Sequence, residues 1–419
     1  MRVFQHPENG PDARPGRSRF QDRPTVGRSL LDRLTALLLA LWGFLAAPGP
    51  LLAVEGGPVV DARGMLVRDG RPYRAIGVNG YDLFVRTLAD PGATNRLDAF
   101  FEPLARLGIP FVRFSACGYW PKDWTLFRTQ PEAHAARFDA VLAAARRHGV
   151  GLIPSLFWHH PTLPDLVGEP VSAWGDPTSR THREMRRYVE AMVARHRDDP
   201  TIWAWELGNE FNLAADLPNA SEHRPPVVPD LGTPTQRTAL DELTHAQVRT
   251  ALKAFAAEIH RLESGRKPIL SGHAFPRVSA WHQERESSWT RDTPEQFAEV
   301  FRADHPDPVS MLSGRLYEES DLDRLPMAME RSRKERKPLF IGEFGVPGPL
   351  DAGKMARFLR MLDRMEELAV PLAAVWVYDY PGQSEDWSIT PSNRRSELLE
   401  LVAERNRRLS RNDSSGAKK

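Results

Sequence analysis

Short apolar runs alternate with amphipathic segments along most of the chain, from Arg74 to Arg408. A continuous apolar run is typical of a strand buried on both faces, whereas apolar residues that recur every three or four positions indicate a helix. Repeated strand–helix pairs predict a (β/α)8 barrel, here of about 330 residues. The predicted strands are 74–79, 109–115, 151–158, 202–207, 267–270, 308–313, 339–342 and 373–378. The predicted helices are 95–107, 132–148, 179–196, 244–262, 294–302, 322–334, 352–368 and 394–408.

A doubly wound α/β sheet is the alternative fold, but it normally has a Gly-rich phosphate loop after its first strand. The stretch Gly77-Val-Asn-Gly80 does not have that pattern. Before the barrel, residues 59–73 predict a short β-hairpin that turns at Asp69-Gly70 and covers the bottom of the barrel. The Pro-rich segment 212–243 is longer than a simple connection, and such loops tend to be functional or disordered.

The N-terminal part of the chain differs in composition from the rest. Residues 1–33 are rich in Arg, Pro and Gly and predict a disordered basic leader. Residues 34–47 are apolar except for Thr35, a length that matches the apolar core of a signal peptide and predicts export to the periplasm or the extracellular space. The alternative is an uncleaved anchor over 34–53, which would associate the protein with a membrane. The expected organisation is therefore leader (1–33), signal or anchor (34–53), barrel domain (54–408) and polar tail (409–419).

Charge and cysteine content narrow the possible partners. Charged residues make up 26% of the chain but the net charge is only +1, so nothing indicates binding to nucleic acid. Cys117 is the only cysteine, which rules out an intrachain disulfide and argues against a thiolate metal site. The sequence has no His/Asp cluster with convincing metal-ligand spacing, so we expect no catalytic metal and no cofactor. We also expect a monomer.

Two predicted strands end on a glutamate. The stretch 203–211 begins as an aromatic and aliphatic strand but ends in Gly208, Asn209 and Glu210, which a strand interior rarely contains. The stretch 338–346 repeats this pattern and contains Glu343 after a glycine. The carboxyl ends of the strands in a parallel barrel form one rim, where active sites lie. The two glutamates therefore predict a paired-carboxylate enzyme, with one group protonated and the other charged.

Other polar residues lie at the same predicted rim. Arg113 ends the second strand, and a guanidinium beside Glu343 would favour the ionised form of that glutamate. Cleavage of a glycosidic bond needs an acid and a second carboxylate opposite it, and Asn209 would then hydrogen-bond a sugar hydroxyl near the reacting carbon. Glu206 lies inside its strand and is interpreted as a buried, paired carboxylate. The rim also includes Asn79, Tyr81, Trp158, His159, His160, His273, Tyr317, Trp376, Tyr378 and Tyr380.

In these residues the sequence resembles clan A of the glycoside hydrolases, and within it glycoside hydrolase family five, to which many cellulases and mannanases belong. The matching features are Asn209-Glu210 after the fourth strand, Glu343 in Ile-Gly-Glu-Phe-Gly, Arg113, Tyr317, Trp376 and the opening hairpin before Gly-Val-Asn-Gly-Tyr. The resemblance covers residues 59–401. It implies retaining hydrolysis, with Glu210 as acid/base, Glu343 as nucleophile and about 5–5.5 Å between the carboxyl groups. It also implies that Tyr317 hydrogen-bonds the nucleophile and that Trp376 forms the floor of the subsite where the bond breaks.

Some positions depart from the family pattern or leave alternatives open. The family often has His-x-Tyr after the sixth strand, whereas this chain has Arg315-Leu316-Tyr317, which would change the charge near the nucleophile. His159 and His160 are adjacent on a strand and point to opposite faces, so we predict a substrate contact for His159 rather than a metal site. His273 is either a substrate ligand or a packing residue. Tryptophans in predicted loops, such as Trp289, either pack beneath the loops or stack on sugar rings.

The residues and the resemblance together predict a retaining O-glycoside hydrolase that acts on a β-linked polysaccharide or oligosaccharide. An endo-β-1,4-glucanase or a β-mannanase is the leading expectation, and the carbohydrate substrate is the expected partner. A barrel that binds carbohydrate without cleaving it is the alternative from a different class. A transglycosylase that uses the same residues is a further alternative.

Overall fold

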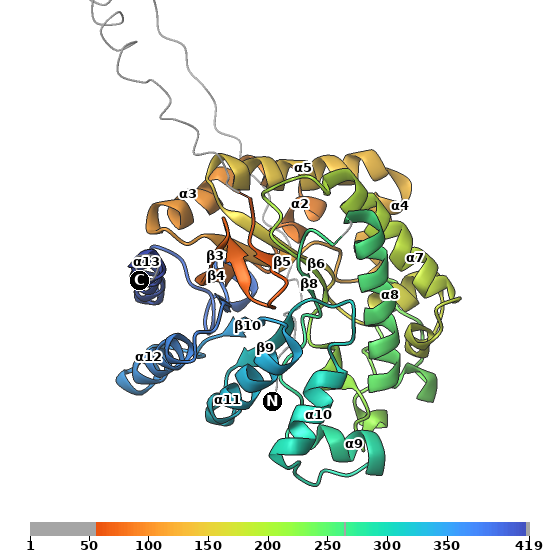
Figure 1. Cartoon of the computed structure of the whole chain (residues 1–419). Helices are drawn as coiled ribbons and strands as arrows, with labels where there is room; N and C mark the ends of the chain where they lie inside the picture. Colours follow the sequence, from red (N-terminus) through yellow and green to blue (C-terminus); the bar gives the residue numbers. More distant parts are fainter. Residues whose placement is uncertain (1–55, 264, 416–419) are drawn as a thin grey trace, which may run out of the picture. The chain divides into compact units, whose positions relative to one another are not determined.

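Eight parallel strands form the centre of the computed structural model, and helices surround them (Figure 1). The structure describes residues 56–263 and 265–415. The strands are paired in the order β8-β7-β6-β5-β4-β11-β10-β9. Their bounds are Ala75–Asn79 (β4), Phe111–Ser115 (β5), Gly151–Phe157 (β6), Trp205–Gly208 (β7), Ile269–Leu270 (β8), Leu312–Leu316 (β9), Leu339–Phe344 (β10) and Leu372–Val375 (β11). This arrangement confirms the predicted (β/α)8 barrel.

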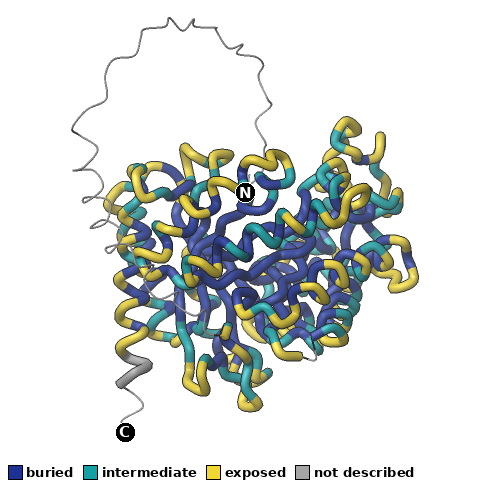
Figure 2. The backbone as a smooth tube through the Cα atoms, turned by 90° about the horizontal axis from the view of Figure 1, so that it is seen from above, coloured by how far each residue is buried: buried dark blue, intermediate teal, exposed yellow. Residues whose placement is uncertain are grey.

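The two strands at the ends of this order also meet. The backbone N–H groups of Ser310 and Met311, just before β9, both donate to the carbonyl of Ile269 in β8, at 3.1 and 3.3 Å. The barrel is therefore nearly closed, which a doubly wound sheet is not. Every residue of the eight strands is buried, as expected for strands covered by helices on one side and filled by side chains on the other. Figure 2 shows the same distribution, with buried backbone in the centre and exposed segments around it.

Helices follow the strands as the apolar pattern predicted. Their bounds are Val85–Ala89 (α2), Leu97–Leu107 (α3), Thr125–Thr129 (α4), Pro131–Arg147 (α5), Thr162–Val167 (α6), Arg180–Val189 (α7), His245–Glu263 (α8), Ala280–Glu286 (α9), Pro294–Ala303 (α10), Glu319–Glu335 (α11), Ala352–Glu367 (α12) and Glu397–Ser415 (α13). The helix predicted over 179–196 is α7 continued by a π-helical segment, Glu190–Ala194. Among the described residues, we find no helix with the length and apolar character that crossing a membrane requires.

A small antiparallel sheet precedes the barrel and contains the predicted hairpin. Strands Leu66–Arg68 (β2) and Arg71–Pro72 (β3) pair across Asp69 and Gly70, whose φ angles of 53° and 75° are both left-handed, as a two-residue hairpin turn requires. Val59–Val60 (β1) adds a third strand on the other side of β2. The ring of Tyr73 lies 5.8 Å from that of Trp203, which precedes β7, so this sheet packs against the amino-terminal end of the barrel.

Most boundaries differ from those predicted by a few residues, and two of these differences change the interpretation of a segment. The sixth barrel strand is β9, Leu312–Leu316, and not 308–313. The apolar residues on which the prediction rests, Val309, Met311 and Leu312, mostly precede the strand, because β9 continues through Gly314 and the buried Arg315. The last helix, α13, extends to Ser415, so the residues expected to form a polar tail from 409 begin inside it, and Leu409 is buried. The predictions for residues 1–53 lie outside the described part of the chain.

The long segment 212–243 is held by short 3-10 turns and by a buried ion pair. Its turns are Phe211–Ala214, Ala220–Glu222, Pro229–Leu231 and Ala239–Asp241. Arg237 binds both carboxylate oxygens of Asp165, in α6, at 2.6 and 2.7 Å. Both side chains are nearly inaccessible to solvent. The segment is therefore attached to the helix that follows β6.

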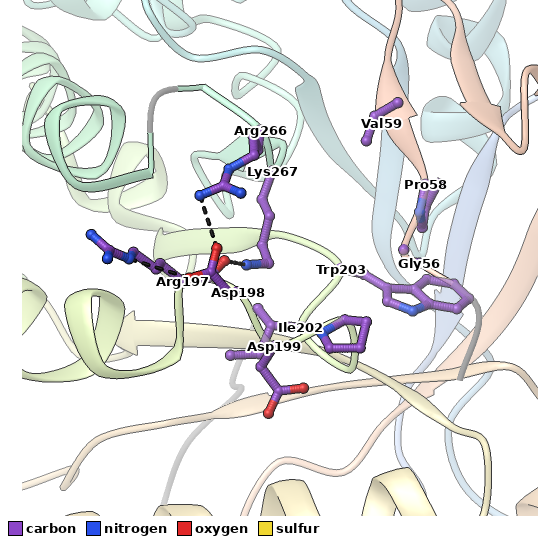
Figure 3. A pocket seen from close by; sticks show the side chains of 12 residues that line it. Gly56, Pro58, Val59, Arg197, Asp198, Asp199, Ile202, Trp203, Arg266 and Lys267 are labelled. Atoms are coloured by element: carbon purple, nitrogen blue, oxygen red, sulfur yellow. Dashed lines mark hydrogen bonds and ion pairs between the residues drawn. The ribbon is translucent and has the colours of Figure 1, made fainter. Parts of the chain in front are cut away.

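A pocket of about 220 Å³ lies at the amino-terminal end of the barrel strands (Figure 3). Its lining includes Gly57 before the small sheet, Trp203 before β7, and Arg266 and Lys267 before β8. Arg266 forms an ion pair with Asp198, at 2.9 Å. The predicted chemistry lies at the carboxyl ends of the strands, so this pocket is not part of the candidate site.

Candidate active site

The register of the barrel brings five polar residues to the carboxyl ends of its strands. Asn79 ends β4 and is paired with Arg113 of β5, whereas Glu343 of β10 is paired with Arg315 of β9. Glu210 is the second residue after the end of β7. Apolar strands thus end together on charged and amide side chains, as the sequence predicted for the two glutamates and Arg113.

Arg113 is the buried centre of this group. Its Nε donates to both oxygens of Glu206, at 2.8 and 3.1 Å, so Glu206 is the buried, paired carboxylate that we expected. Its Nη1 donates to Asn79 at 2.9 Å and to Glu343 at 2.8 Å, and its Nη2 donates to Asn209 at 2.8 Å. The guanidinium carbon lies 4.5 Å from the ring centroid of Trp158. These contacts leave the arginine little rotational freedom.

Glu343 accepts hydrogen bonds on both carboxylate oxygens. Oε1 accepts from Arg113, and Oε2 accepts from the hydroxyl of Tyr317 at 2.7 Å. Burial and the charge of Glu343 raise the pKa of Tyr317 well above its usual value, so this hydroxyl keeps its proton and remains a donor. The carboxylate itself is only 5% exposed. Its orientation is therefore fixed from two sides.

Glu210 lies beside Glu343 but is more open to solvent. Its side chain is 22% exposed, and its backbone is left-handed, with φ of 55°. The backbone N–H donates to the carbonyl of Gly272 at 3.0 Å, which ties the end of β7 to the residues after β8. Burial, followed by the charge of Glu343, raises the pKa of Glu210 to about 7, although Arg315 and Arg113 oppose the shift.

Asn209 is oriented by two guanidinium groups. Its Oδ1 accepts from Arg113 and from Arg315, at 2.8 and 3.1 Å. Because arginine can only donate, the oxygen of the amide must face the two arginines. The amide nitrogen is thereby left to donate elsewhere.

Asn79 and Arg315 contribute to the site, although the sequence predicted Asn79 only as a rim residue without a role and predicted no place in the site for Arg315. The amide nitrogen of Asn79 donates to the carbonyl of Gly342 at 2.9 Å, and its oxygen accepts from Arg113, so it links β4 to β5 and β10. An amide at the end of a buried strand was the available signal for Asn79. Arg315 had been noted only as a departure from the family pattern, and it lies between the two glutamates, with Nε 3.4 Å from Glu343 and 3.9 Å from Glu210.

Aromatic rings pack next to the polar group. Trp376 follows β11 and stacks on Trp158, with centroids 6.1 Å apart and planes inclined by 26°. Its Nε1 donates to Gln383, and the residue is buried. The half-buried ring of Trp387 meets Tyr317 edge-on at 5.4 Å. Trp376 thus lies in the layer of rings beneath Arg113, and its role as a subsite floor remains a prediction.

The two predicted histidines differ in their surroundings. His159 is half-buried and stacks on Tyr119, with centroids 4.4 Å apart. His273 is fully buried, with its ring 5.6 Å from that of His305, and burial lowers the pKa of His273 to about 3. Its carbonyl, rather than its ring, reaches the site, where it accepts from Arg315. This favours the packing interpretation of His273 over a substrate contact. Within residues 56–263 and 265–415, we find no group of His, Cys, Asp and Glu arranged to hold a metal ion.

The fold and the site together define a (β/α)8 barrel with a paired-glutamate site at the carboxyl ends of its strands. One glutamate is held by an arginine and a tyrosine, and the other has a raised pKa. This is the pairing that two-carboxylate glycosidases use.

Comparisons with known proteins agree with this class. Mannan endo-1,4-beta-mannosidase 7 of Arabidopsis thaliana is 30% identical over 209 residues, which cover 43% of this chain and 48% of the relative. The chain thus spans about half the length of the curated relatives that it matches. No family model matches the chain.

Solved structures share the fold. The endo-1,4-beta-mannanase of Rhizomucor miehei has a TM-score of 0.61 at 15% identity, covering 85% of this chain and 99% of the other. A glycoside hydrolase family 5 mannosidase from the same organism has a TM-score of 0.60 at 12% identity, covering 86% of this chain and all of the other. The resemblance to glycoside hydrolase family five that the sequence predicted is confirmed. The relatives carry the names of glycosidases, the enzyme class that was predicted.

Proposed function

We propose that the chain is a retaining glycoside hydrolase that cleaves a β-1,4-linked polysaccharide or oligosaccharide, with a mannan backbone as the first expectation. The observation that carries this proposal is the pairing of Glu210 and Glu343, whose Oε1 atoms both lie within 4 Å of the same Arg315 nitrogen. Two adjacent carboxylates with different environments can divide the roles of acid and nucleophile.

Glu343 is suited to be the nucleophile. Donors face both of its oxygens, an arrangement that fits a charged carboxylate with no proton of its own. In the first step, one oxygen attacks the anomeric carbon of the sugar, and a covalent glycosyl-enzyme intermediate forms. The buried Arg113 and Tyr317 keep the attacking group in place and lower the entropy cost of reaching the reacting geometry.

Glu210 is suited to be the acid and base. With a pKa of about 7, it carries a proton through the mildly acidic range and can donate it to the departing glycosidic oxygen. After the leaving group has departed, Glu210 is charged and can remove a proton from the water that attacks the intermediate. The product then leaves, and Glu210 again holds the proton.

The names of the relatives support mannan as the substrate to test first, because curated relatives that match the chain are mannan endo-1,4-beta-mannosidases. A β-1,4-glucan is the second expectation. The alternative from another class is a barrel that binds carbohydrate without cleaving it. The ion pair between Arg113 and Glu343 argues against this, because binding alone gives no reason to bury a charged nucleophile in a fixed orientation.

The deciding experiment measures product release from mannan, soluble cellulose, xylan and mixed-linkage β-glucan. Wild type is compared with Glu210→Ala and Glu343→Ala. We expect activity on one substrate and losses of at least about 1,000-fold in both variants. Products longer than the donor chain would indicate transglycosylation. Tight binding without turnover would contradict the hydrolase proposal and favour the binding barrel.

A further inference from the structure

Arg315 is a buried arginine of the site that lies within ion-pair distance of both Glu210 and Glu343. Its Nε is 3.4 Å from Oε1 of Glu343 and 3.9 Å from Oε1 of Glu210. Its Nη2 donates to Asn209 at 3.1 Å. A single side chain of β9 thus reaches the two proposed catalytic carboxylates and the amide that precedes one of them.

Backbone carbonyls fix the position of this guanidinium. Nη2 donates to the carbonyl of Gly272 at 2.7 Å, and Nη1 donates to those of Gly314 and His273, at 3.1 and 3.3 Å. Gly342 provides the space, because a Cβ atom there would lie 2.2 Å from Nη1. Arg315 is only 2% exposed. Its charge is therefore a permanent part of the site and not a mobile surface group.

The environment of Arg315 differs from that of Arg113. The charge of Arg113 is matched by Glu206, a carboxylate that is fully buried and reaches neither solvent nor a substrate. The carboxylates within ion-pair distance of Arg315 are Glu210 and Glu343 themselves. One positive charge beside two carboxylates is balanced when one of them is charged and the other protonated. That is the state in which a nucleophile and an acid are present together.

We propose that Arg315 is a positioning residue that holds Asn209 together with Arg113, and that its charge favours ionisation of Glu210 and so sets the upper pH limit of the singly protonated state of the Glu210–Glu343 pair. The proposal rests on the proposed function in one respect, namely that this pH limit is also the upper pH limit of catalysis. The protonation of Glu210 can be followed without any substrate.

Several charged groups act on Glu210, and the direction of the expected change follows from them. Burial and Glu343 raise its pKa, whereas Arg315, Arg113 and Arg277 lower it, with Arg315 the strongest of the three. The hydroxyl of Tyr317 faces Glu343 and stays protonated, and burial keeps His273 neutral, so neither adds a charge that could replace that of Arg315. Removing the positive charge of Arg315 should therefore make Glu210 hold its proton to a higher pH.

The test is a 13C NMR titration of the glutamate carboxyl carbons, with the Glu210 signal assigned by its loss in Glu210→Gln. We expect Arg315→Gln to raise the titration midpoint of Glu210 by about one pH unit. Arg315→Lys should leave the midpoint near that of wild type because it keeps the charge. Arg277→Gln is the matched control. Arg277 donates to the Leu213 carbonyl and acts on Glu210 at longer range, so its loss should raise the midpoint less.

Activity adds a second measurement on the substrate identified above. In Arg315→Gln, the basic limb of the pH profile of kcat/KM should move to higher pH by the same amount as the titration midpoint of Glu210. In Arg315→Lys the limb should stay in place while kcat/KM falls, because Asn209 loses one of its two donors. If Arg315→Gln does not fold, Arg315→His takes its place, since an unprotonated histidine above about pH 7 also lacks the charge.

An unchanged Glu210 midpoint in the variants without the charge would overturn the proposal, even if their stability and kcat/KM fell, because a purely structural role predicts that result. If the Arg315 variants shift the Glu210 midpoint as expected but the wild type cleaves no substrate, the proposed function is refuted and the role of Arg315 in the protonation of the pair stands. The two proposals can thus fail separately.

Discussion

Arg113 shows how one buried side chain can fix the orientation of several others. Each nitrogen of its guanidinium faces an acceptor, namely Glu206 at Nε, Asn79 and Glu343 at Nη1, and Asn209 at Nη2. Burying a cation costs several kcal/mol unless its donors are satisfied. These bonds offset that cost and hold the acceptors in place before a substrate arrives, which is what preorganised catalysis requires.

The raised pKa of Glu210 has a consequence for stability. A carboxyl whose pKa is higher in the folded than in the unfolded state favours folding at low pH, and this contribution is lost as pH rises from about 4.5 to about 7. Glu210→Gln cannot ionise and avoids the loss. We expect it to be more stable than wild type by about 1–3 kcal/mol at about pH 8, with a much smaller difference at about pH 5. Thermal unfolding at both pH values measures the effect.

Glu206→Gln is the matched comparison, because it makes the same chemical change at a carboxylate that forms an ion pair with Arg113. It removes the charge that balances the buried Arg113 and should destabilise the protein by about 3–5 kcal/mol at neutral pH. If Glu210→Gln stabilised the protein equally at both pH values, the raised pKa of Glu210 would be contradicted.

At the scale of single residues, the sequence identifies site residues that stand at the end of an apolar run. Glu210, Glu343 and Arg113 stand out because a polar residue interrupts a buried strand at its carboxyl end. The position of Arg315 between the glutamates is not visible in the sequence, because its partners Gly272 and Asn209 lie 43 and 106 residues away. The choice between ligand and packing for His273 likewise depended on burial, which a single polar residue in the sequence does not reveal.

The carboxyl ends of β7 and β8 lie in close contact, and Gly272, just after β8, makes this contact possible. Its φ is +74°, and a Cβ atom there would lie 1.8 Å from the carbonyl oxygen of Gly208. Its own carbonyl accepts from the backbone of Glu210 and from Arg315. The end of β7, which leads into Asn209 and Glu210, is thus connected to the residues after β8 through a position where a side chain does not fit.

Gly272→Ala should therefore damage both stability and activity. We expect a loss of at least about 3 kcal/mol in unfolding free energy and a lower kcat/KM, because the end of β7 must move. Gly108→Ala is the control. Gly108 has a similar φ of +70° but no atom within 4 Å of an added Cβ, so only the backbone strain of about 1–2 kcal/mol applies. Equal losses in the two variants, measured by denaturant unfolding, would show that the close contact does not matter.

The apolar pattern predicted the strands and helices of the barrel better than it predicted their boundaries. The sixth strand was placed on the apolar run before β9, whereas the strand itself extends through Arg315, where a charged residue hides the pattern of a buried strand. Residue 315 is buried because Gly342 makes room for it and carbonyl groups receive its donors. Such compensation comes from neighbouring strands, so no local rule could place this boundary.

At the scale of the whole barrel, repetition made the fold predictable. Strand–helix pairs of similar length leave few topologies, and the missing phosphate loop favoured the closed barrel over the open sheet. The contacts that attach the surrounding helices to the strands were not predictable, because they join single residues of distant segments. One of these joins the last helix, α13, to the first barrel strand, β4, through Asn406.

Asn406 takes the place of a neighbouring strand at that point. Its Oδ1 accepts from the N–H of Ile76 and its Nδ2 donates to the carbonyl of Ile76, both at 2.8 Å. The pairing of β4 with β5 begins only at Val78, so the side chain satisfies backbone groups that this part of the ladder does not reach. Asn406 is 8% exposed, and water therefore cannot readily replace it.

Asn406→Ala should lower the unfolding free energy by at least about 2 kcal/mol, because two buried backbone groups lose their partners. The turnover number should not change below the unfolding transition, since Ile76 lies at the start of β4 and the site lies at the carboxyl ends of the strands. Asn406→Asp sharpens the test. A charged aspartate would face the carbonyl of Ile76 without a donor, whereas a protonated one can donate to it, so the stability of this variant should recover as the pH is lowered. Unfolding curves at neutral and acidic pH for both variants measure this, and an Ala variant as stable as wild type would mean that the contact between α13 and β4 does not stabilise the barrel.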